Sequence, residues 1–263
     1  MRPIASRIAR FAAALAAVSL AAAACGDRAA DVERFALDRS TAVTFEASDG
    51  VKLAGRVFGD DNAGAGVVLA HMLPADQTSW YAFAERLGDA GYRALTFDFR
   101  GYCPGGGGGC SQGEKNITAI WQDVQGAVTY LRNQGVQRVA LVGASMGGTA
   151  SLIVAGQPGS DIRAVATLSA LASIEGLTVT PEVLQGITAA KLFIAGNGDT
   201  GPAQDAQAFY NATLQPKRVE ILPSNDHGTD LLTGNQSENV RTLLLSWLEQ
   251  FNPVEAETRG TGT

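Results

Sequence analysis

The sequence predicts an α/β protein with a mostly parallel central sheet, an antiparallel hairpin at its start and helices on both faces. Short apolar runs recur along the chain, and such runs are typical of strands that are buried on both faces. Helical stretches separate most of these runs, and strands that alternate with helices form parallel sheets. The expected strands are Val67–Ala70, Ala94–Phe97, Val139–Val142, Ala164–Leu168, Lys191–Ala195 and Arg218–Leu222.

The hairpin is expected where the folded domain begins. Val43–Phe45 and Lys52–Phe58 alternate between apolar and polar residues on either side of Asp49-Gly50. An Asp-Gly pair between two alternating segments is a strong hairpin signal. We therefore expect an antiparallel pair of strands before the first parallel strand.

The clearest helix is expected over Ile117–Asn133. Its apolar residues recur at the i, i+3, i+4, i+7 spacing of a helix face, and Gly135 follows as a stop signal. Trp80–Ala90 and Asn239–Phe251 show the same spacing. These helices would cover the sheet.

Composition excludes several classes of protein. The chain has 263 residues, 46% of them hydrophobic and 17% charged, which is typical of a globular protein. A formal net charge of −6 argues against a nucleic-acid partner, which would need a basic patch. With 2 His and 3 Cys, the chain has too few ligands for most structural zinc sites. We expect neither a metal nor a cofactor.

The N-terminus has the pattern of a secretory signal. Arg2, Arg7 and Arg10 precede Phe11–Ala24, an uncharged run that is too short to cross a bilayer comfortably. The run ends in Ala-Ala-Ala followed by Cys25, which resembles the lipobox of bacterial lipoproteins and implies lipidation of Cys25, on the outer side of the cytoplasmic membrane, or else secretion. The predicted divisions are a signal peptide (1–24), a tether (25–40), one folded domain (41–251) and a flexible tail (252–263).

A candidate nucleophile follows one of the buried strands. Gly143-Ala144-Ser145-Met146-Gly147 fits the pattern G-x-S-x-G, with a strand before it and a helix-compatible segment after it. The turn must be sharp, so small residues flank the serine and its hydroxyl projects above the sheet. The alternative is an ordinary serine in a glycine-rich turn, which the surrounding strand and helix disfavour.

This arrangement resembles the α/β-hydrolase superfamily over Thr41–Phe251. In that family an acid and then a histidine follow the serine in chain order. The resemblance implies Asp199, after the expected strand Lys191–Ala195, as the acid and His227, after the last strand, as the base. Asp226 is the rival acid, although a direct neighbour in sequence rarely points at the ring nitrogen it must hold.

The same resemblance implies an oxyanion hole. One backbone N–H would come from Met146 and the other from Leu73, with Met72 as the second choice because the family usually has glycine at that position. His71 precedes the serine in sequence, so we expect it to support this loop through hydrogen bonds and to take no part in proton transfer.

The implied activity is hydrolysis of carboxylic esters through an acyl-enzyme on Ser145. A serine at the elbow argues against the dehalogenase and epoxide-hydrolase branches of the family. Only Ala170–Ala190 separates the expected strand Ala164–Leu168 from the acid-bearing strand, so we expect a small cap or none, as in dienelactone hydrolases and small carboxylesterases. Peptidase, amidase or thioesterase activity on the same residues remains open, as does a non-catalytic, envelope-binding lipoprotein.

Two cysteines bracket a glycine-rich segment. Cys103 and Cys110 enclose Pro104 and Gly105–Gly109, next to Asp98-Phe99-Arg100-Gly101. No third ligand lies close in sequence, and no Gly-Lys-Ser/Thr follows, so a metal site or a phosphate-binding loop is disfavoured. In an oxidising compartment we expect these cysteines to form a disulfide at the rim of the Ser145 site.

Overall fold

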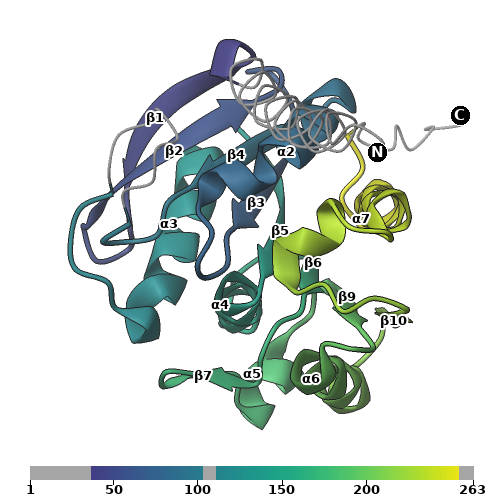
Figure 1. The fold of residues 1–263 in the computed structure, drawn as a ribbon. Coiled ribbons are helices and arrows are strands. Elements are labelled where there is room, and N and C mark those ends of the chain that lie inside the picture. Colours follow the sequence, from purple (N-terminus) through teal and green to yellow (C-terminus); the bar gives the residue numbers. More distant parts are fainter. Residues whose placement is uncertain (1–36, 103–110, 255–263) are drawn as a thin grey trace, which may run out of the picture. The chain divides into compact units, whose positions relative to one another are not determined.

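The computed structural model describes residues 37–102 and 111–254, and the chain from Arg39 onward forms one compact unit. In this described part, an eight-stranded sheet has the order β1-β2-β4-β3-β5-β6-β9-β10 (Figure 1). Its strands are β1 (Ser40–Glu46), β2 (Lys52–Phe58), β3 (Ala65–Ala70), β4 (Arg93–Phe97), β5 (Arg138–Ala144), β6 (Ile162–Leu168), β9 (Ala190–Gly196) and β10 (Lys217–Leu222). β1 pairs antiparallel with β2, and β2 with β4, while all other pairs are parallel. The predicted fold class is confirmed.

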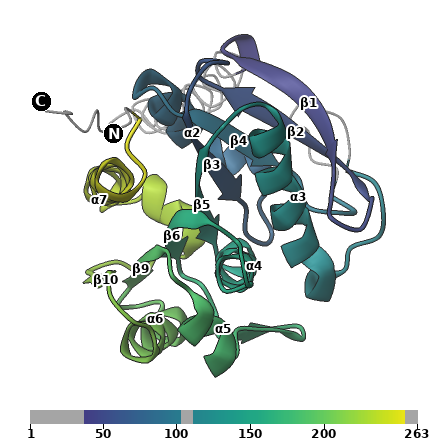
Figure 2. The same cartoon turned by 180° about the vertical axis from the view of Figure 1, so that it is seen from behind.

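Helices cover both faces of the sheet. They are α2 (Tyr81–Asp89), α3 (Ile120–Asn133), α4 (Met146–Ala155), α5 (Pro181–Gly186), α6 (Thr200–Ala212) and α7 (Ser237–Phe251). α2 and α7 lie on one face, where Arg86 of α2 and Glu238 of α7 form an ion pair of 3.1 Å. α3, α4 and α6 lie on the other face, as the two opposite views show (Figures 1 and 2).

The helix expected over Ile117–Asn133 begins with a tighter turn. Residues Ile117–Ala119 form a 3-10 helix, η2, and the α-helix starts at Ile120. The Asn116 side chain caps this start by accepting a hydrogen bond of 3.1 Å from the Thr118 N–H. An asparagine cap satisfies an N–H group that has no partner within the helix. Within residues 37–102 and 111–254, no helix has the length and apolar character needed to cross a membrane.

Two expectations at the end of the chain were wrong. The run that became β10 was expected to be buried on both faces, but β10 lies at the edge of the sheet and Ile221 is 40% exposed. The flexible tail expected over 252–263 includes Asn252, but this side chain is fully buried and donates to the Gly66 carbonyl at 3.1 Å. Arg138 also donates to the carbonyls of Pro253 and Val254. The first residues after α7 are therefore part of the fold.

The connection between β6 and β9 is short, as expected. It contains a small hairpin of β7 (Ser173–Ile174) and β8 (Leu177–Thr178), followed by α5. Thr180 caps α5 by accepting a hydrogen bond of 3.3 Å from the Val183 N–H. The hairpin before α5 was not predicted.

Candidate active site

The candidate site residues gather at one edge of the sheet. β3, β5, β6, β9 and β10 are parallel neighbours, so their carboxyl ends meet at the same edge. The register aligns Ala70 with Gly143, Ala144 with Leu168, and Leu222 with Gly196. Ligands of open α/β sheets bind at this edge. Leu73, Ser145, Asp199 and His227 each lie directly after one of these strands or a few residues further along the chain.

Ser145 lies in a sharp turn between β5 and α4. Its backbone has φ 48° and ψ −119°, a combination that is strained for a residue with a side chain. Its N–H donates to the Leu168 carbonyl at 2.9 Å, which ties the turn to β6. A Cβ on Gly143 would lie 2.3 Å from the Gly147 carbonyl, so this close turn excludes larger residues. The predicted elbow geometry is present.

Asp199 and His227 contact each other across the ends of β9 and β10. Asp199 Oδ2 and His227 Nδ1 are 2.8 Å apart. A carboxylate can only accept, so Nδ1 carries the proton in the neutral ring and Nε2 keeps its lone pair. The His227 side chain is 34% exposed and that of Asp199 is 15% exposed, so the ring remains accessible from solvent. This tautomer is the one a general base requires.

The loop that carries His227 packs against the other two site segments. A Cβ on Gly228 would lie 2.4 Å from Met72 Sδ and 3.4 Å from Ala144 Cβ. Gly228, the residue after His227, thus lies against Ala144, which precedes Ser145, and against Met72 on the loop after β3. Gly228 also has φ 56°, so glycine suits the position for its backbone as well as for space. Met72 is buried and fills this junction with its side chain.

His71 holds the loop after β3 in place. Its Nε2 accepts a hydrogen bond of 3.1 Å from the Phe99 N–H, so Nδ1 carries the proton and donates to the Met72 carbonyl at 2.9 Å. The ring is fully buried, and this burial lowers the pKa of His71 to about 4, so the imidazole is neutral. Both ring nitrogens are occupied, as the expected supporting role requires.

Met146 and Leu73 are the two expected oxyanion donors. Met146 is the first residue of α4, and the first N–H groups of a helix have no partner within it. The positive end of the helix dipole also favours a negative charge at this point. Leu73 directly follows Met72 on the loop that His71 holds, and its side chain is half-buried.

Asp226, the rival acid, points elsewhere. Its Oδ2 accepts a hydrogen bond of 2.7 Å from the Ser224 hydroxyl. A Cβ on Gly234 would lie 1.9 Å from the same oxygen, so the carboxylate packs against that glycine. The ring of His227 is therefore held by Asp199, as the sequence predicted.

A comparison with known proteins agrees with this geometry. Residues 67–215 match the family model described as alpha/beta hydrolase fold. The chain belongs to the α/β-hydrolase family. The matched segment contains Ser145 and Asp199 and ends before His227, which the structure nonetheless brings to Asp199.

Relatives of this α/β hydrolase are distant. It is 26% identical over 240 residues to the protein YfhR of Escherichia coli O157:H7, covering 80% of this chain and 81% of that protein. An esterase of Pyrococcus furiosus superposes with a TM-score of 0.65 at 18% identity, covering 81% of this chain and 93% of its own. A dienelactone hydrolase of Anabaena variabilis superposes with a TM-score of 0.66 at 19% identity, covering 81% and 99%. At these identities the solved structures establish the fold alone.

One buried contact near the site was not predicted. Asp98, which is 1% exposed, accepts hydrogen bonds from the Gln77 N–H at 3.0 Å and from the Gln77 side-chain amide at 2.6 Å. Burial raises the pKa of Asp98 to about 7, although the two donors oppose this shift. Gln77 lies on the same loop as Leu73, so Asp98 fixes the far end of the loop that His71 holds at its start. A buried aspartate directly after an apolar strand was the available signal.

Other predicted residues lie outside the described part of the chain. Cys25, Cys103 and Cys110 belong to the undescribed ranges 1–36 and 103–110, so the lipid anchor and the disulfide stay predictions.

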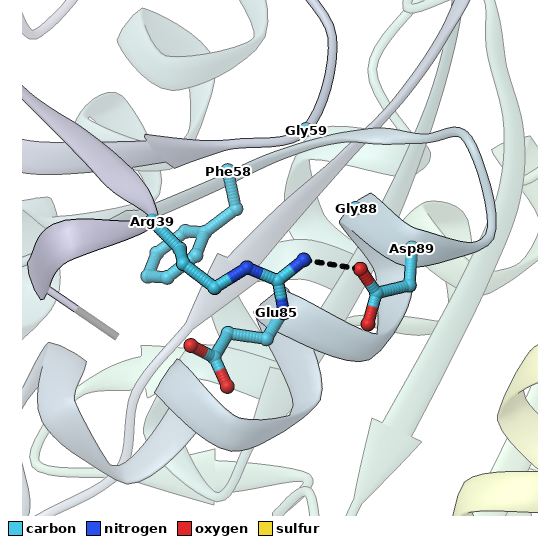
Figure 3. Close-up of a pocket in the computed structure, with 6 residues that line it drawn as sticks. All are labelled: Arg39, Phe58, Gly59, Glu85, Gly88 and Asp89. Carbon is cyan, nitrogen blue, oxygen red and sulfur yellow. Dashed lines mark hydrogen bonds and ion pairs between the residues drawn. The ribbon is translucent and has the colours of Figure 1, made fainter. Parts of the chain in front are cut away.

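Two surface pockets differ in their relation to this site. One, of about 170 Å³, is lined by Arg39, Phe58, Gly59, Glu85, Gly88 and Asp89 (Figure 3). It lies where β2 and α2 end, at the sheet edge opposite the carboxyl ends of the parallel strands, and an ion pair between Arg39 and Asp89 crosses it. The other, of about 430 Å³, includes Leu73 of the predicted oxyanion loop in its lining. Only the second adjoins the candidate active site.

Proposed function

We propose that this chain is a serine hydrolase that cleaves carboxylic esters through an acyl-enzyme on Ser145. The observation that carries the proposal is the 2.8 Å hydrogen bond between Asp199 and His227 beside the strained elbow of Ser145. Three such residues in this chain order and at this sheet edge are the arrangement that activates a serine hydroxyl.

The reaction follows from the assigned proton positions. His227 Nε2 accepts the Ser145 proton as Oγ attacks the acyl carbon, and then gives that proton to the departing alcohol oxygen. Asp199 keeps the ring in the required tautomer and stabilises the imidazolium. The backbone N–H groups of Met146 and Leu73 donate to the oxygen of the tetrahedral intermediate. A water molecule, deprotonated by Nε2, then attacks the acyl carbon and releases the acid and Ser145.

The triad is tested by matched substitutions. Ser145→Ala and His227→Ala should each abolish most hydrolysis of 4-nitrophenyl butyrate while the far-ultraviolet circular dichroism stays unchanged. Asp199→Asn should lower kcat by about four orders of magnitude, because the amide favours the wrong tautomer of His227. Asp226→Asn is the control and should keep kcat within about threefold. A near-normal kcat in Asp199→Asn together with a collapse in Asp226→Asn would reverse the assignment of the acid.

Fluorophosphonate labelling separates the classes of function. An enzyme should be labelled on Ser145 and lose the label in Ser145→Ala, whereas a non-catalytic, envelope-binding lipoprotein should not be labelled at all. Peptidase, amidase and thioesterase activity differ from esterase activity in the leaving group. A panel of matched butyrate esters, thioesters and anilides therefore distinguishes them, and we expect the highest kcat/KM on the esters.

We also propose that the enzyme acts in the bacterial cell envelope, lipid-anchored through Cys25 or secreted. The support is the N-terminal pattern of Arg2, Arg7 and Arg10 before Phe11–Ala24. Stable anchoring needs more than one acyl chain on the protein. Intact-mass analysis of the mature protein tests this, since a lipidated Cys25 adds the acyl masses. The same sample, alkylated without reduction, should show no modified Cys103 or Cys110 if they form a disulfide.

A further inference from the structure

The pocket beside the predicted oxyanion loop has the features of a substrate site. It is an open pocket of about 430 Å³, which is within the range of small-molecule sites. Its lining comes from the loop after β3, from the segment that leads into η2, and from the turn of the β7–β8 hairpin. The lining residues are Leu73, Tyr102, Lys115, Asn116, Ile117, Thr118 and Glu175. The hairpin closes one side, since a Cβ on Gly176 would lie 3.1 Å from Thr118 Cγ2.

The location of the pocket assigns it to the acyl part of an ester. His227 must protonate the leaving alcohol, and His227 follows β10 at one end of the strand order. The pocket residues Tyr102 and Lys115 follow β4, on the far side of β3 and β5 from β10. With the carbonyl oxygen at Leu73 and the alcohol toward His227, the acyl chain extends toward β4 and into this pocket.

Among the residues that the structure describes, Lys115 is the one basic residue in the lining of this pocket. Lys115 Nζ lies 4.2 Å from the centroid of the Tyr102 ring, and that ring lies 5.1 Å from the ring of His71. Burial is the main cause of the lowered pKa of His71, and the charge of Lys115 adds a smaller contribution in the same direction. Within the described ranges, no carboxylate lies within ion-pair distance of Lys115 Nζ. The ammonium group is held by a cation–π contact and keeps its hydrogen-bond donors for a ligand.

Glu175 is the opposing charge of the pocket. It lies at the tip of the β7–β8 hairpin, with φ 45° at its backbone. Its charge raises the pKa of the Tyr102 hydroxyl, after burial as the larger cause, so the two residues are close enough to interact electrostatically. Within this pocket Glu175 would repel an anion, whereas Lys115 would attract one.

We propose that this pocket selects esters whose acyl chain ends in a carboxylate, with Lys115 as the residue that binds this carboxylate. Leu73, Ile117 and the ring of Tyr102 contact the methylene groups between the carboxylate and the ester carbonyl. The inference rests on the proposed esterase activity and specifies its substrate class, a half-ester of a short dicarboxylic acid.

Two substrates of equal chain length test the selection. Monoethyl glutarate carries the terminal carboxylate, and ethyl pentanoate does not. The ratio of kcat/KM for monoethyl glutarate to kcat/KM for ethyl pentanoate should fall about fivefold in Lys115→Met, mainly because the KM of the half-ester rises. A change of about fivefold corresponds to the loss of one partly exposed charge contact. Lys115→Arg should keep most of the ratio because it keeps the charge. Lys52→Met removes an exposed lysine outside the pocket, changes the net charge equally, and should leave the ratio unchanged.

The outcomes separate this inference from the proposed function. Hydrolysis of ethyl pentanoate that Ser145→Ala abolishes supports the esterase, whatever Lys115 does. An unchanged ratio in Lys115→Met, or an equal fall in Lys52→Met, overturns the role of Lys115. If neither ester is turned over, calorimetric titration with glutarate still decides, because binding should weaken about fivefold in Lys115→Met and an absence of binding to the wild-type protein refutes the proposal.

Discussion

The backbone strain at Ser145 can be released without touching any other residue. Its φ of 48° and ψ of −119° lie outside the regions that a residue with a Cβ adopts without cost. Glycine tolerates this conformation, and alanine does not. We therefore compare Ser145→Gly with Ser145→Ala, because both lack the hydroxyl and differ only in the Cβ.

The expected difference comes from three contributions. Relief of a strained φ/ψ pair stabilises the folded state by about 1–3 kcal/mol. The greater freedom of glycine in the unfolded chain removes about 0.4–1 kcal/mol of this gain. Ser145 is 3% exposed, so loss of the methyl group from alanine costs at most about 0.8 kcal/mol. Ser145→Gly should thus be more stable than Ser145→Ala by about 1 kcal/mol, which is about 2–4 °C in Tm for a domain of this size.

Thermal unfolding followed by circular dichroism, with urea titrations at 25 °C, measures this difference. Asp161→Gly is the control, because Asp161 also has a positive φ of 49° but lies on the surface away from the site. Aspartate adopts the left-handed region with little strain, so that variant should gain less than about 0.5 kcal/mol. The reasoning is refuted if Ser145→Gly is no more stable than Ser145→Ala, since the elbow would then store no strain.

Two further substitutions test the loop and the turn around the site. Burial raises the pKa of Asp98 from 3.8 to about 7, so folding favours its protonated form. The free energy of unfolding should therefore fall by up to about 4 kcal/mol as the pH rises from about 4 to about 7. Urea titrations across this range should show the fall in the wild type and a flatter profile in Asp98→Asn, which mimics the neutral acid; parallel profiles would contradict the assignment. In Gly147→Ala the new Cβ would lie 2.4 Å from the carbonyl oxygen of Ala70 and 2.5 Å from that of His71, so the variant should lose at least about 2 kcal/mol of stability and most activity. Gly201→Ala, which meets nothing within 4 Å inside α6, should be neutral or stabilising, and equal losses in both variants would speak against the close approach at Gly147.

Most of the sheet was predictable because each buried strand is a local apolar run. The hairpin of β1 and β2 was predictable from Asp49-Gly50, whose turn chemistry is local as well. The small hairpin of β7 and β8 was missed because its strands have two residues each, Ser173–Ile174 and Leu177–Thr178, and two residues cannot show an alternation. The exposure of Ile221 depends on the position of β10 in the strand order, which no local pattern encodes.

The candidate site also contains one contact that the sequence predicted and one that it did not. The pairing of Asp199 with His227 could be predicted, because the order of the residues along the chain and the strands before them carry that information. The hydrogen bonds between Gln77 and Asp98 join residues 21 positions apart on two different strand ends. Neither residue belongs to a recognisable pattern with the other, so only their three-dimensional arrangement reveals that the loop of Leu73 is held at both ends.

The hairpin of β7 and β8 has a consequence for how this scaffold can diversify. Its turn, Glu175-Gly176, is exposed and lies between two very short strands, and exposed loop tips tolerate insertions of extra chain. A helical subdomain spliced into this turn would roof the pocket of Lys115 while leaving all eight strands of the described sheet and their register intact. The proposed catalytic residues lie at the ends of the long strands, so an insertion at this turn would leave them in place. Grafting at 175–176 is thus a direct way to change access to the proposed active site.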